Sequence, residues 1–126
     1  MLGRIQNELF DLGADLATPQ GMDGALRIQS DQVERLEREI DRMNEDLDAL
    51  RSFVLPAGEG GAAGLYLARA VARRAERCAV AAGDGLSPVA LAYLNRLSDH
   101  LFVLARWVAR ERGGDILWQP GATRGA

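Results

Sequence analysis

Apolar residues recur at alternating steps of three and four along four stretches of the chain, which is the spacing of one face of an α-helix. The first stripe ends before Pro19, and the second follows Ser30, a candidate N-cap. The fourth follows Ser87 and Pro88, an N-cap and first-turn pair. The stripes are Leu2, Ile5, Leu9, Leu12 and Leu16; Val33, Leu36, Ile40, Met43, Leu47 and Leu50; Gly64, Ala68, Val71, Ala72, Ala75, Cys78 and Ala79; and Leu94, Leu97, Leu101, Leu104 and Val108.

Breaks rich in proline and glycine follow the second, third and fourth stripes, at residues 53–61, 83–85 and 113–114. No stretch shows the alternating pattern of a strand, so the sequence predicts an all-α, antiparallel four-helix bundle. The third helix is expected over residues 62–82. Its packing stripe consists of small residues, which allow neighbouring backbones to come close, so we expect this helix to be central.

Composition fits one domain with a modest core. The chain has 126 residues, is 48% hydrophobic and carries a formal net charge of −3. This charge favours neither a nucleic-acid nor an anionic-membrane partner. No apolar run is long enough to span a membrane and no leader is recognised, so a cytoplasmic protein is expected. The single cysteine, Cys78, cannot form an intramolecular disulfide and is expected in the core.

Polar residues line a second face of the third predicted helix. Arg69, Arg73 and Glu76 fall within about 60° of arc at 100° per residue. Guanidinium groups beside a carboxylate could clamp a phosphorylated anion, because their forked donors match phosphate oxygens. The alternative is a solvated helix face with internal ion pairs, and spacing alone favours that alternative.

The fourth predicted helix also has a polar face, opposite in character to its leucine stripe. Asn95 could orient a ligand there, or be a surface amide, and Phe102 could pack at the edge of the core. His100 has no second histidine or cysteine near it, so no metal site is predicted. The chain contains no P-loop, CxxC or HExxH motif and no evident nucleophile with a nearby base, so no catalytic side chain is assigned.

Four motifs in this order resemble those of the PduO-like ATP:cob(I)alamin adenosyltransferases. They are IQNELFDLGADLA at 5–17, FVLP at 53–56, RAVARRAER at 69–77 and YLNRLSDHLFVLAR at 93–106. The similarity covers residues 1 to about 120. It implies one adenosyltransferase-like domain over residues 1–120, with a tail at 121–126.

The resemblance also implies an activity. Family members are homotrimers of five-helix bundles with active sites between subunits, and they transfer the 5′-deoxyadenosyl group of ATP to cob(I)alamin, releasing triphosphate. The cobalt(I) is itself the nucleophile, which agrees with the absence of a catalytic side chain. Magnesium is expected from triphosphate chemistry rather than from visible ligands.

Site roles carry over position by position from the resemblance. Arg73, Glu76 and Asn95 match residues that contact ATP. Arg69 matches an arginine that pairs with an acidic residue across the subunit interface. Phe53 and Phe102 match aromatic residues that crowd the lower face of the corrinoid.

Two departures from the family pattern bear on these roles. His100 stands where the family usually has tyrosine, and the Thr/Gly/Asp-rich triphosphate loop and the first helix have no counterpart. The expected fold is therefore the five-helix bundle minus its first helix, with an uncovered apolar face that favours self-association. Two alternatives remain open: a non-catalytic relative that keeps corrinoid binding, and a plain oligomeric scaffold.

Overall fold

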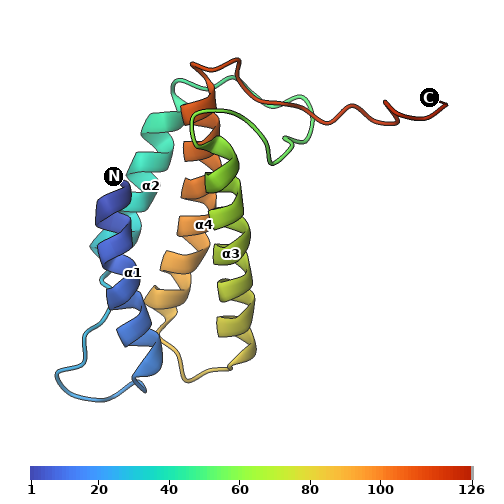
Figure 1. The fold of residues 1–126 in the computed structure, drawn as a ribbon. Helices are drawn as coiled ribbons and strands as arrows, with labels where there is room; N and C mark the ends of the chain where they lie inside the picture. Colours follow the sequence, from blue (N-terminus) through green and yellow to red (C-terminus); the bar gives the residue numbers. More distant parts are fainter. Residues whose placement is uncertain (126) are drawn as a thin grey trace.

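The computed structural model describes residues 1–125 and contains four helices. The helices run up and down alongside one another, with successive helices antiparallel (Figure 1). This arrangement confirms the predicted all-α four-helix bundle. Their bounds are Leu2–Ala17 for α1, Ser30–Asn44 for α2, Ala62–Ala81 for α3 and Pro88–Ala109 for α4. Residue 126, the end of the predicted tail, lies outside the described residues.

The central element is α4, which packs against both α2 and α3. Twelve of its residues are buried, against four in α3. The prediction that the third helix is central was therefore wrong. Small residues let α3 approach α4 closely along a narrow strip, but they leave its other side open, with Leu67, Val71 and Val80 exposed. None of the helices in residues 1–125 is long and apolar enough to cross a membrane.

Three further local predictions need correction. The second helix ends at Asn44, so Leu50 of its predicted stripe lies exposed in the following loop. Gln29 caps α2 instead of Ser30, because its backbone N–H donates to the Gln32 side chain in a capping box. Cys78 is exposed rather than in the core.

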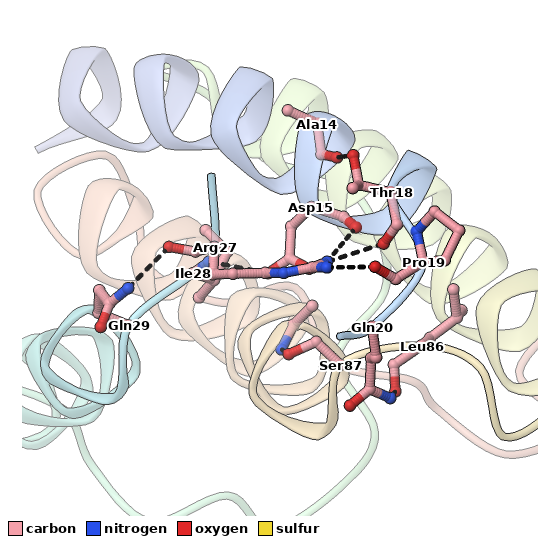
Figure 2. Close-up of polar contacts among 11 residues, drawn as sticks. Ala14, Asp15, Thr18, Pro19, Gln20, Arg27, Ile28, Gln29, Leu86 and Ser87 are labelled. Carbon is pink, nitrogen blue, oxygen red and sulfur yellow. Dashed lines mark hydrogen bonds and ion pairs between the residues drawn. The ribbon is translucent and has the colours of Figure 1, made fainter. Parts of the chain in front are cut away.

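The first helix is held at its C-terminal end by a buried carboxylate. Asp15 is 1% exposed and accepts hydrogen bonds at 2.8 Å from the backbone N–H of Ile28 and from Arg27 Nη1. The same guanidinium donates to the carbonyl oxygens of Thr18 and Pro19, so it closes the loop between α1 and α2 (Figure 2).

A second polar cluster joins α1, α2 and α4. Glu8 of α1 and Arg35 of α2 form an ion pair, and both side chains are buried. Arg35 also lies 3.6 Å from a Glu39 oxygen, and the other Glu39 oxygen lies 3.0 Å from His100 Nε2 on α4. Burial lowers the pKa of His100, and the contact with Glu39 opposes this only in part. The imidazole is therefore neutral at pH 7, and its Nε2–H donates to the Glu39 carboxylate, which can only accept.

An apolar groove of about 480 Å³ lies between α1 and α3, above α4. Leu9 and Val71, on the two rims, are both exposed. The groove is lined by Leu2, Ile5, Gln6, Leu9, Leu65, Ala68, Val71, Ala72, Ala75, Leu97 and Leu101. It matches the uncovered apolar face expected from the sequence, since few polar groups interrupt it.

Replacing Asp15 by alanine should lower the free energy of unfolding by about 3 kcal/mol, because a buried N–H and a guanidinium lose their acceptor. Urea denaturation measures the change. Asp23→Ala, at an exposed position in the same loop, is the matched control and should be close to neutral. Equal denaturation midpoints for the two variants would contradict the anchoring role.

Protonation of His100 should make stability depend on pH. Its pKa in the folded chain is below the ordinary 6.5, so the unfolded chain binds the proton first as pH falls. The free energy of unfolding should therefore decrease as the pH falls from about 7.5 to about 5.5. His100→Gln keeps a hydrogen bond to Glu39 but cannot titrate, and urea midpoints should show a weaker decrease for it. Parallel curves would rule out His100 as the source.

Candidate functional site

The two polar faces expected from the sequence meet in the structure. Asn95 Nδ2 on α4 donates a hydrogen bond of 2.9 Å to Glu76 Oε2 on α3. Glu76 is half-buried and Asn95 is exposed, so the pair lies at the surface where the two helices touch. Packing of α3 against α4 along the alanine strip brings these two side chains together.

Arg96 orders the amide of Asn95. Its Nε donates to Asn95 Oδ1 at 3.2 Å, and its Nη2 lies 2.7 Å from Asp99 Oδ2. The amide oxygen therefore faces Arg96 and the amide nitrogen faces Glu76. This row of charged and neutral groups has a defined orientation before any ligand binds, which reduces the ordering cost of binding.

Arg73 lies one turn before Glu76 on α3 and is exposed. An accessible guanidinium beside a carboxylate–amide pair suits a ligand that carries both anionic oxygens and neutral hydrogen-bonding groups. Arg73, Glu76 and Asn95 thus occupy one surface region, although they do not line any of the larger cavities.

A cavity of about 380 Å³ begins at Arg69, one turn of α3 before Arg73. It brings together Phe53, Arg69 and Phe102, three of the residues singled out from the sequence, and is completed by Leu50, Ser52 and Val54. The Arg69 guanidinium lies over the Phe102 ring, 5.0 Å from its centroid, in a cation–π contact. Tyr66 meets the same ring edge-to-face at 6.1 Å.

Arg69 connects the two regions. It precedes Arg73 by one turn on the same face of α3 and also borders the aromatic cavity. The six predicted residues therefore form two adjacent subsites: a polar one around Glu76 and Asn95, and an aromatic one around Phe102.

From the sequence, Trp118 was assigned no role, and its contact with Phe53 was missed. The two rings pack at 5.8 Å, and the Trp118 N–H donates to the Phe53 carbonyl at 2.8 Å. The signal was present as an apolar run at 116–118 after the last helix. Its partner could not be found without the fold, because the two segments are far apart in the chain.

Metal-ligating side chains do not cluster: residues 1–125 contain no group of three or more His, Cys, Asp or Glu side chains placed to hold a metal ion.

Tyr66, which packs on Phe102, has a raised pKa. Burial is the largest cause of this shift and Asp115 adds to it, so the phenol stays neutral near pH 7.

Comparison with known proteins agrees with this architecture. A family model described as cobalamin adenosyltransferase matches residues 1–108. The corrinoid adenosyltransferase of Mycobacterium tuberculosis is 49% identical in an alignment 133 residues long, which covers 100% of this chain and 68% of that protein. The corrinoid adenosyltransferase of Bacillus subtilis is 42% identical over 94% of this chain and 62% of its own length.

A solved structure shows the same fold. A variant of the PduO-type ATP:corrinoid adenosyltransferase from Lactobacillus reuteri, complexed with cobalamin and ATP, superposes with a TM-score of 0.83. It is 33% identical, and the match covers 94% of this chain and 68% of that one. The fold and these similarities thus define a helical-bundle protein of the adenosyltransferase type. The chain belongs to the cobalamin adenosyltransferase family.

Proposed function

We propose that this protein is a corrinoid adenosyltransferase, which transfers the 5′-deoxyadenosyl group of ATP to cob(I)alamin and releases triphosphate. The observation that carries the proposal is the adjacency of a polar subsite at Glu76–Asn95 and an aromatic subsite at Phe53 and Phe102. Family membership and the likeness to a structure complexed with both cobalamin and ATP support it.

In this reaction the cobalt(I) of the substrate attacks the C5′ atom of ATP. A cobalt–carbon bond forms, the C5′–O bond breaks, and triphosphate leaves with the bonding electrons. The protein holds the two substrates in line and stabilises the charge of the leaving group, so no side chain needs to act as a nucleophile.

The polar subsite would take ATP. Arg73 would pair with triphosphate oxygens, whose charge grows as the C5′–O bond breaks, while Glu76 and Asn95 would hydrogen-bond the rest of the nucleotide. Magnesium would accompany the triphosphate. Because no cluster of three metal-ligating side chains exists in residues 1–125, no step is assigned to a protein-held ion.

The aromatic subsite would take the corrinoid. Phe53 and Phe102 present apolar rings that can crowd the lower face of the macrocycle and keep its nucleotide base detached. Loss of this axial ligand makes cobalt(II) easier to reduce, so the aromatic wall assists the step before alkyl transfer.

A second candidate function is corrinoid binding without catalysis. One observation favours it: Phe53, Arg69 and Phe102 line one open cavity, whereas Arg73 and Asn95 are exposed and line none of the cavities described above. Calorimetry with each ligand separates the two functions, because a non-catalytic relative would bind cobalamin but not ATP.

The direct test supplies reduced cobalamin and ATP to the full chain and follows the corrinoid absorption spectrum. Formation of adenosylcobalamin is the expected result. Absence of product, together with absence of binding of either ligand, would refute the proposed function while leaving the fold intact.

Replacing Arg73 by alanine should weaken ATP binding about 10- to 150-fold, the loss of a charge-assisted contact worth about 1.5–3 kcal/mol. Cobalamin binding should not change. The exposed neighbour Arg74 points about 100° away around α3, so Arg74→Ala is the matched control. Similar ATP affinities for the two variants, measured by calorimetry, would exclude Arg73 from the nucleotide site.

The apolar groove between α1 and α3 should drive self-association, with homotrimer the expected state; Arg69 would support the interface. Val71→Glu places a charge on the groove rim and should shift the sedimentation coefficient toward monomer while helical circular dichroism persists. Val80→Glu, at an equally exposed position of α3 outside the groove, serves as the control. A compact wild-type monomer would contradict this expectation.

A further inference from the structure

The loop that carries Phe53 is paired with the segment after α4. Val54 and Leu117 form an antiparallel bridge, the Leu55 N–H donates to the Ile116 carbonyl at 2.8 Å, and Ser52 Oγ donates to the Trp118 carbonyl at 2.8 Å. Together with the Trp118–Phe53 backbone bond, these contacts make a short two-limbed ribbon of residues 52–55 and 115–118.

A buried arginine on α4 anchors both limbs of this ribbon. Arg106 is 8% exposed, and its Nε donates to Asp115 Oδ2 at 2.9 Å. Its Nη2 donates to the Asp48 carbonyl at 2.8 Å, just before the other limb. Arg106 follows Phe102 by one turn of α4, so the ribbon is tied to the helix that forms the floor of the aromatic cavity.

Two large aromatic side chains remain exposed at the tip of this ordered ribbon. Phe53 is 76% exposed and Trp118 is 46% exposed, although they pack on one another. Exposed apolar rings beside a cavity are typical of a binding face, since folding alone gives no reason to leave them in water. The Trp118 ring restricts where the Phe53 ring can lie.

We infer that Trp118 is a positioning residue for the corrinoid: it holds Phe53 in the orientation that faces the macrocycle. This inference rests on the proposed function and adds to it a residue outside the motifs. Trp118 acts through Phe53 and not on ATP, because the nucleotide subsite at Glu76–Asn95 lies on the other side of Arg69. Replacing Trp118 should therefore change the KM for cobalamin and leave the KM for ATP unchanged.

The test measures steady-state kinetics of the full chain with each substrate varied in turn. Trp118→Ala should raise KM for cobalamin about two- to tenfold, the range expected for loss of an aromatic pair, and leave KM for ATP unchanged. Trp118→Phe should restore most of the loss. Ile116→Ala is the matched control, since its side chain is equally exposed on the same limb and its backbone bond to Leu55 remains.

A double-mutant cycle separates positioning from a direct contact. In a Phe53→Ala background, Trp118→Ala should cause no further loss of corrinoid affinity, because the residue through which it acts is gone. Additive losses, an equal effect of Ile116→Ala, or a matching rise in KM for ATP would each overturn the inference.

Failure of this inference can be told apart from failure of the proposed function. If wild-type chain neither binds nor adenosylates cobalamin, the proposed function falls and the inference falls with it. If wild-type chain is active and Trp118→Ala matches it, only the inference is overturned. Amide hydrogen exchange at Leu55, faster in Trp118→Ala than in Ile116→Ala, would support the coupling of the two limbs without any ligand.

Discussion

Burial of α4 between α2 and α3 determines where each polar side chain on that helix can point. Its buried residues occupy most of its circumference, so only narrow strips remain for less buried residues such as Asn95 and Phe102. One strip faces α3, and this places the amide against Glu76 and the phenyl ring beneath Arg69. Rotating α4 by one residue would bury the amide and expose leucine, which the hydrophobic effect opposes. The core packing and the site geometry are therefore the same constraint.

Polar contacts hold α1 in the bundle, where the apolar core alone provides few contacts. The first helix packs weakly against α4 and depends on two buried carboxylates, Asp15 at one end and Glu8 near the middle. Each carboxylate is paired with an arginine, Arg27 or Arg35, so the charge is compensated where it is removed from water. These pairs fix the height of α1 relative to α2.

Periodicity predicted much of this fold because helices are local. The third and fourth helices begin at the expected residues, and Glu76 and Asn95, from the two predicted polar faces, form a hydrogen bond. Periodicity tells which face of a helix is buried, but not how many neighbours cover it, and so the central position of α4 was missed. The exposure of Cys78 follows from the same ambiguity. Trp118 was missed because its partner depends on a pairing between distant segments, which no local pattern encodes.

The bridge between Val54 and Leu117 also orders events in time. It closes a loop of backbone that contains α3 and α4, and it joins segments that leave the ribosome at different times. The helices can form and pack as they are synthesised, since their contacts lie earlier in the chain. Phe53, by contrast, stays without its aromatic neighbour Trp118 until both α3 and α4 have been synthesised. The aromatic pair beside Phe102 is thus completed only after all four helices of the bundle have been made.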